Sequence, residues 1–148
     1  MELQTLIDER DIARALSTFA RILDSKRWED LGDVFAAEVA FDYGTGEEQS
    51  GMEAMRANMA RFLDVCGQTQ HLIGSVLIDV DSDHAISRAY VQARHQAVDG
   101  SGGPVFDTNG EYIDRWERRD EGWRIVRRDV QWSTFFGDAA IIMGAAGD

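Results

Sequence analysis

The sequence predicts an α+β fold in which helices come first and antiparallel strands follow. Apolar residues recur at helical spacing in the first third of the chain, whereas the second half alternates between small or apolar and polar residues. Turn residues at Asp81-Ser82-Asp83 and Glu121-Gly122 divide the alternating part into strands. Helices followed by antiparallel strands indicate an α+β architecture. We find no internal repeat, low-complexity tract or linker, so residues 1–148 are expected to form one domain.

Three helices are expected in the N-terminal half. The first carries one buried stripe with members four, three, one and three residues apart, namely Ile12, Leu16, Phe19, Ala20 and Leu23. Asp24 follows at the border of this stripe, where a rotation of about 100° per residue lets it point inward at the helix end. A short helix is expected from Trp28 to Phe35, and a third from Met52 to Val65.

The expected strands run from Val39 to Tyr43, from Leu72 to Val80, from Ala85 to Val98, through Tyr112 and Trp116, and from Trp123 to Trp132. In the strand from Ala85 to Val98, odd-numbered positions are small or apolar and even-numbered positions are mostly polar. His95 therefore belongs to the inward face. Tyr90 and Trp132 are assigned to the outer face. Asp114 shares a face with Tyr112, where a salt bridge to a neighbouring arginine is expected.

Charge and cysteine content restrict the partners and the compartment. The net charge of −12 argues against nucleic acid and anionic membranes as partners, because the long-range field would repel both. The single Cys66 permits no internal disulfide, which suits a reducing cytoplasm. The first residues are acidic where a signal peptide needs basic ones, and no stretch approaches the roughly 20 apolar residues of a membrane span. A cytoplasmic location is therefore expected.

Two histidines and one aspartate are the candidates for chemistry. His71 and His95 lie in neighbouring predicted strands, and Asp24 can reach the same interior from its helix. A buried imidazole oriented by a carboxylate transfers protons near neutral pH. Two other interpretations remain open at this point. Each histidine could be a core residue hydrogen-bonded to a backbone carbonyl, or the three side chains could form a two-histidine, one-carboxylate iron site.

Four segments of the chain resemble scytalone dehydratase. They are Leu23 to Leu31, Thr69 to Gly74, Arg94 to Gln96, and Asp129 to Trp132. More broadly, the chain is identified as a member of the SnoaL-like branch of the NTF2-like superfamily. The resemblance implies a cone, in which a strongly bent antiparallel or mixed sheet wraps around a cavity that the N-terminal helices close. It also implies a homotrimer, with a dimer as the alternative.

The resemblance also implies roles for individual residues. Asp24 and His71 match the Asp–His dyad of these lyases, His95 matches a second catalytic histidine, and Tyr43 matches a tyrosine that holds a water molecule. Other positions depart from the relatives: leucine stands at 23 and glycine at 110, where the relatives have tyrosine and serine. The residues expected to bind the substrate are Phe19, Trp28, Tyr112 and Gln131.

Together these features predict a cofactor-independent lyase of the dehydratase type that acts on a small, mostly apolar cyclic molecule. Neither a metal nor a cofactor is required by this chemistry. An isomerase could use the same base, and a non-catalytic ligand-binding or assembly module could keep the cone without the chemistry. The apolar segment Ala139 to Met143 is expected to close the cavity or to dock on a neighbouring subunit.

Overall fold

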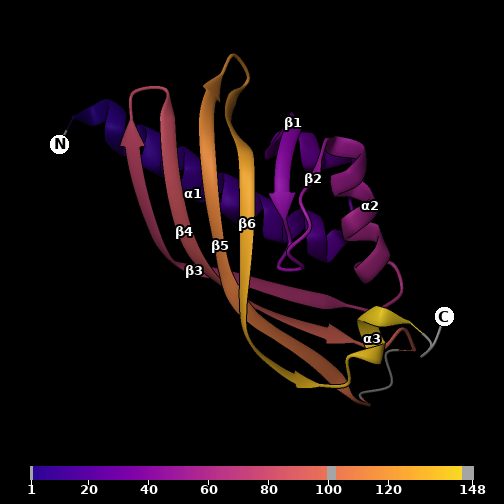
Figure 1. The fold of residues 1–148 in the computed structure, drawn as a ribbon. Coiled ribbons are helices and arrows are strands. Elements are labelled where there is room, and N and C mark those ends of the chain that lie inside the picture. Colours follow the sequence, from indigo (N-terminus) through magenta and orange to yellow (C-terminus); the bar gives the residue numbers. More distant parts are fainter. Residues whose placement is uncertain (1, 100–102, 145–148) are drawn as a thin grey trace.

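The computed structural model describes residues 2–99 and 103–144, which form a curved sheet flanked by helices (Figure 1). The elements are α1 (Leu3–Ser25), the 3-10 helix η1 (Trp28–Asp33), β1 (Phe35–Asp42), β2 (Gln49–Ser50), α2 (Met52–Leu63), β3 (Thr69–Asp81), β4 (His84–Gln96), β5 (Val105–Arg119), β6 (Gly122–Gly137) and α3 (Ala140–Met143). Within the described residues, no helix is both long enough and apolar enough to cross a lipid bilayer.

The six strands form one mixed sheet in the order β2-β1-β6-β5-β4-β3. Every neighbouring pair is antiparallel except β1 and β6, which run parallel. Strands β3 to β6 are long and curl around α1, while β1, β2 and α2 stand at the other edge (Figure 1). The predicted α+β fold with a bent, mixed sheet is therefore confirmed.

The apolar stripe of α1 packs into the concave face of the sheet, mainly against β3. All five residues of the predicted stripe are buried. The helix ends where Lys26 adopts a left-handed conformation with φ of 53°, and its N–H bonds back to the last turn. Asp24 therefore lies in the final turn of α1, directly beside the start of β3. The helical spacing placed this residue correctly at an inward-turning helix end.

Two of the predicted helices differ from the structure, and the predicted strands begin or end a few residues from the observed ones. The segment expected to be a helix from Trp28 to Phe35 forms the short η1, and Phe35 instead begins β1, where its backbone pairs with β6. The helix expected to reach Val65 ends at Leu63. Both differences arise because tertiary strand pairing and chain reversal override local helical spacing.

A bulge in β6 reverses the side-chain alternation as far as Trp132, and a second one at Ser133 reverses it again. Arg115 pairs with Arg127 and Trp116 pairs with Ile125, so Val126 is an extra residue on β6. One extra residue flips every later side chain to the other face. The assignment of Trp132 to the outer face was therefore wrong, because Trp132 lies on the concave face.

Candidate active site

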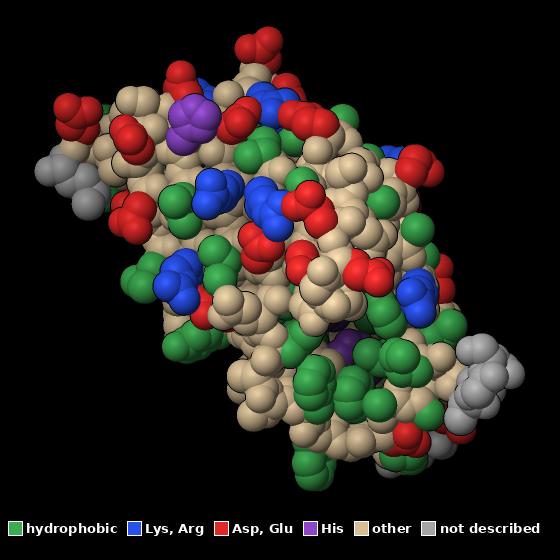
Figure 2. Space-filling model, in the orientation of Figure 1, with side chains coloured by type: hydrophobic (Ala, Val, Ile, Leu, Met, Phe, Trp, Pro, Cys, Tyr) green, Lys and Arg blue, Asp and Glu red, His purple; other side chains and the backbone are tan. Residues whose placement is uncertain are grey.

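An apolar cavity of about 220 Å³ lies between the concave face of the sheet, α2 and α3. Leu63 and Phe62 from α2, Trp132 and Phe135 from β6, and Ile142 from α3 provide apolar walls. Figure 2 shows a histidine inside a hollow that hydrophobic side chains surround. The cavity thus offers a small molecule a mostly apolar environment with few polar groups.

Asp24 and His71 form a hydrogen-bonded dyad at one side of this cavity. Oδ1 of Asp24 lies 2.7 Å from Nδ1 of His71, and Oδ2 accepts the backbone N–H of His71 at 3.1 Å. Thr69 donates its hydroxyl to Oδ1 at 2.8 Å. The predicted contact between the carboxylate and the imidazole is present, and both groups are brought together by the end of α1 and the start of β3.

The hydrogen bonds around Asp24 determine which nitrogen of His71 faces the cavity. Burial alone would raise the pKa of Asp24, but hydrogen bonds from His71 and Thr69 outweigh it and hold the pKa below its ordinary value. The carboxylate is therefore ionised and accepts the proton on Nδ1. In the neutral form of the imidazole this leaves Nε2 without a proton, which is the arrangement of a general base.

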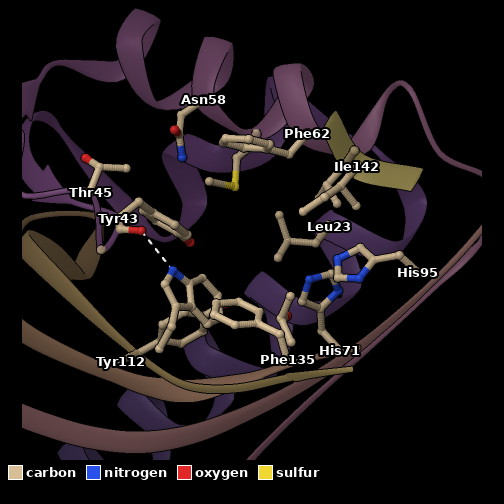
Figure 3. A pocket seen from close by; sticks show the side chains of 15 residues that line it. Leu23, Tyr43, Thr45, Asn58, Phe62, His71, His95, Tyr112, Phe135 and Ile142 are labelled. Carbon is tan, nitrogen blue, oxygen red and sulfur yellow. Dashed lines mark hydrogen bonds between the residues drawn. The ribbon is translucent and has the colours of Figure 1, made fainter. Parts of the chain in front are cut away.

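His95 faces His71 across the site, with ring centroids 5.8 Å apart and planes at 86° (Figure 3). Its Nδ1 lies 2.8 Å from the carbonyl oxygen of Phe106, which can only accept, so Nδ1 donates. Burial lowers the pKa of His95, and the imidazole is neutral at neutral pH. His95 therefore offers a second unprotonated Nε2. The expectation that both histidines share one cavity is confirmed.

Tyr43 and Tyr112 lie on another side of the cavity, away from the two histidines (Figure 3). Their ring centroids are 6.2 Å apart, and the indole of Trp132 donates to the backbone carbonyl of Tyr43 at 3.0 Å. Burial raises the pKa of both phenols, so both remain protonated. Gly44 makes the indole contact possible, because a Cβ at this position would lie 2.5 Å from Trp132.

A buried ion pair stands behind the two tyrosines. Arg128 donates from Nε and Nη2 to the two carboxylate oxygens of Asp114, each at 2.8 Å, and both side chains have no exposed surface. The expected salt bridge of Asp114 is therefore present. Arg128 was not among the predicted site residues, because regular alternation from Trp123 places Arg128 on the outer face until the bulge at Val126 turns it inward.

Three of the residues expected to bind substrate lie outside the cavity lining. Phe19 is fully buried beneath Tyr112, at a ring distance of 5.8 Å, and Trp28 donates its indole N–H to Asp64 on the outside of α2. Gln131 is exposed on the opposite face of the sheet, because the β6 bulge reversed its direction. Tyr112 lines the cavity as expected.

The iron-site interpretation does not fit the geometry of the dyad. The two carboxylate oxygens of Asp24 are directed at the His71 ring, the His71 backbone and Thr69, and do not converge with both imidazoles on one point. Within the described part of the chain, no group of three or more His, Cys, Asp or Glu side chains is arranged to hold a metal ion.

Comparison with known proteins adds a family model and curated relatives from mycobacteria. The model of the SnoaL-like domain matches residues 4–129 of this chain. An uncharacterized protein of Mycobacterium tuberculosis is 26% identical over 122 residues, which make up 82% of each chain. This relative carries no assigned activity, so it supports the family relation and nothing further about chemistry.

Solved structures share the fold at low identity. A protein from Novosphingobium aromaticivorans, provisionally named a scytalone dehydratase, has a TM-score of 0.80 and 22% identity, covering 89% of this chain and 88% of that one. An NTF2-like superfamily protein from Salmonella enterica has a TM-score of 0.77 and 15% identity, covering 88% and 94%. A hexachlorocyclohexane dehydrochlorinase has a TM-score of 0.73 and 16% identity, covering 99% and 97%.

Proposed function

Because the chain belongs to the SnoaL-like domain family, we propose that it is a cofactor-independent lyase acting on a small, mostly apolar cyclic molecule. The observation that carries this proposal is the dyad, in which Asp24 holds Nδ1 of His71 at 2.7 Å and the imidazole lines an apolar cavity. Similar folds include proteins named a dehydratase and a dehydrochlorinase, and both of those names denote eliminations.

In the proposed reaction, Nε2 of His71 removes a proton from a carbon next to an electron-poor group. The electron pair of the broken C–H bond forms the new double bond, and the leaving group departs with its own bonding pair. Asp24 stabilises the resulting imidazolium without taking its proton. The imidazolium can then protonate a departing hydroxide, which restores neutral His71, whereas a halide needs no proton.

His95 and Tyr43 have complementary parts in this proposal. His95 accepts through Nε2, because its Nδ1–H is already bonded to Phe106, so it can hold a substrate hydroxyl or water. Tyr43 is a protonated phenol and can donate. An apolar wall around these few groups suits a ring compound, because the ring would bury apolar area while its polar atoms meet the histidines and the phenol.

The first test is hydrogen exchange at carbon, which requires the base but no leaving group. We expect the wild-type protein to exchange the α-hydrogens of a bicyclic ketone such as tetralone in D2O, with exchange read by mass spectrometry. His71→Gln should reduce the rate by about 10²–10⁴-fold, as loss of a general base does. His84→Gln is the matched control, because His84 is exposed in the β3–β4 turn and should exchange at the wild-type rate.

A ketone that carries a β-hydroxyl or β-halide is the substrate that distinguishes a lyase from an isomerase. Release of water or halide with a new double bond supports the lyase, and return of the proton to another carbon supports the isomerase. Binding without exchange at any carbon would leave a ligand-binding module and overturn both enzymatic proposals.

A further inference from the structure

The ion pair between Asp114 and Arg128 has no part in the base chemistry described above, yet it touches the cavity wall. Both side chains are fully buried, and the guanidinium lies 3.9 Å from the ring centroid of Tyr112 and 4.3 Å from that of Phe19. A buried ion pair contributes little net stability compared with apolar side chains of the same volume. Its contact with a cavity phenol is therefore the property that needs explaining.

The geometry of the guanidinium leaves one nitrogen for that phenol. Nε and Nη2 are used by Asp114, and Nη1 donates to the hydroxyl oxygen of Tyr43 at 3.3 Å. The ring of Tyr112 packs beside that of Tyr43, with centroids 6.2 Å apart. Because the Tyr43 oxygen already accepts the hydrogen bond from Arg128, the proton of Tyr43 is left to donate elsewhere.

The open direction for that proton is the cavity. Figure 3 places the hydroxyl of Tyr43 toward the cavity interior, with His71 and His95 on the far side. The aromatic rings around Arg128 hold the guanidinium in place, so the donor is preorganised before a ligand arrives. A fixed donor in a site shielded from water stabilises negative charge on a ligand oxygen.

We propose that Arg128 is a positioning residue that fixes Tyr43 as a hydrogen-bond donor, so that the cavity prefers the anionic form of a ring compound that carries an oxygen. Arg128 does not contact the ligand in this arrangement and acts by occupying the acceptor side of the Tyr43 oxygen. The inference does not depend on the base chemistry of His71.

The probe for this subsite is para-nitrophenol, an aromatic ring of suitable size with a coloured phenolate form. A cavity donor should stabilise the phenolate, so the bound probe should have a lower pKa than the free probe, read from phenolate absorbance across a pH series. Tyr43→Phe should reduce the preference for phenolate over phenol by about tenfold. An unchanged preference in this variant would overturn the oxyanion site.

Two changes test the role of Arg128 without leaving an unpaired buried charge. The double variant Arg128→Gln with Asp114→Asn removes both charges together, and Arg128→Lys keeps the charge against Asp114 but has a single amino group for two partners. Each should weaken phenolate binding in the presence of Tyr43 and have no further effect in the Tyr43→Phe background. Equal effects in both backgrounds would overturn the positioning role.

The matched control is a second bidentate pair, Asp8 with the partly exposed Arg118, which lies outside the cavity. The variant Asp8→Asn with Arg118→Gln should leave the probe pKa unchanged, and an equal shift there would mean that the effect is general loss of packing. The probe measurement and the exchange measurement test the two proposals separately. A preference for phenolate without hydrogen exchange at carbon would support the subsite and reject the lyase. Hydrogen exchange without a preference for phenolate would support the base chemistry and reject the subsite.

Discussion

At the scale of single residues, Asp24 decides what His71 can do. Its ionised carboxylate accepts from Nδ1 at 2.7 Å, which leaves Nε2 as the base. Asp24→Asn should fold, because the amide oxygen can still accept the His71 backbone N–H while the amide NH2 donates to Thr69 and to Nδ1 of His71, which favours the wrong tautomer. We expect α-hydrogen exchange to fall by about 10²–10⁴-fold with ligand affinity nearly unchanged. Wild-type exchange in this variant would contradict the dyad's assigned role.

Gly110 shows why the serine of the dehydratases cannot simply be restored. A Cβ at this position would lie 2.5 Å from the backbone oxygen of Gln131 and 2.9 Å from the Trp132 ring. Gly110→Ser should therefore lower the free energy of unfolding by about 1–3 kcal/mol, measured by denaturant titration. Gly74→Ser is the control, because a Cβ there meets no heavy atom within 4 Å. Equal costs for both variants would show that the close approach is irrelevant.

At the scale of elements, α1 is tied to the β5–β6 hairpin by Asp8. Its carboxylate accepts from Arg118 and from the Trp123 indole, and chiefly the Arg118 hydrogen bonds lower the pKa of Asp8 from 3.8 to about 2. A carboxyl group whose pKa is lower in the folded state stabilises the protein at pH values above the pKa that the group has in the unfolded chain. The contribution of the Asp8 carboxylate to stability is therefore complete above pH 3.8 and is lost as the pH falls toward about 2.

Asp8→Asn should cost about 1–2 kcal/mol at neutral pH, allowing for solvent around the partly exposed Arg118, and should flatten the acid side of the stability curve. Chemical denaturation at several pH values measures both effects. Asp83→Asn is the control, because Asp83 pairs with the same arginine but is 74% exposed. Equal changes in the free energy of unfolding for the two variants would show that the buried contact of Asp8 stabilises the protein no more than the exposed contact of Asp83.

The second element-scale prediction concerns α3, which supplies Ile142 to the cavity wall. Within the described residues, the tail expected to form a lid therefore does reach the cavity. Ile142→Ser should weaken para-nitrophenol binding about three- to tenfold, because apolar contact is lost at the cavity. Met143→Ser is the control, since Met143 is 62% exposed and does not line the cavity.

Truncation after Phe136 extends the same comparison to the whole tail. A lid predicts loss of binding and turnover with the oligomer intact. Dissociation of the oligomer with unchanged binding would show that the tail serves assembly instead.

At the scale of the whole molecule, the convex face of the sheet exposes apolar side chains between charged pairs. Leu72 and Tyr90 are 58% and 60% exposed there, beside the surface pairs of Arg88 with Glu111 and Arg94 with Asp107. We propose that this face assembles the homotrimer, with a dimer as the alternative. Tyr90→Glu should lower the oligomeric mass in light scattering without changing para-nitrophenol binding. A wild-type monomer at micromolar concentration would reject both assemblies.

The sequence by itself determined the elements whose pattern is local. The stripe of α1 and the alternation of β4 depend only on neighbours along the chain, and they placed Asp24 and His95 on inward faces. His71 was the third candidate because it lies beside the neighbouring predicted strand, and the resemblance to the dehydratases added Tyr43. These four residues could therefore be predicted from the chain, because each follows from a local pattern or a matched segment.

Tertiary structure decided what depends on strand pairing. The bulge at Val126 is fixed by the registers with β1 and β5, and it turned Arg128 and Trp132 inward and Gln131 outward. No spacing along the chain encodes that register, because each side chain takes its face from its strand's hydrogen-bonded partners. The contact of Arg128 with Tyr43 joins residues 85 positions apart, so it exists only once the sheet has formed.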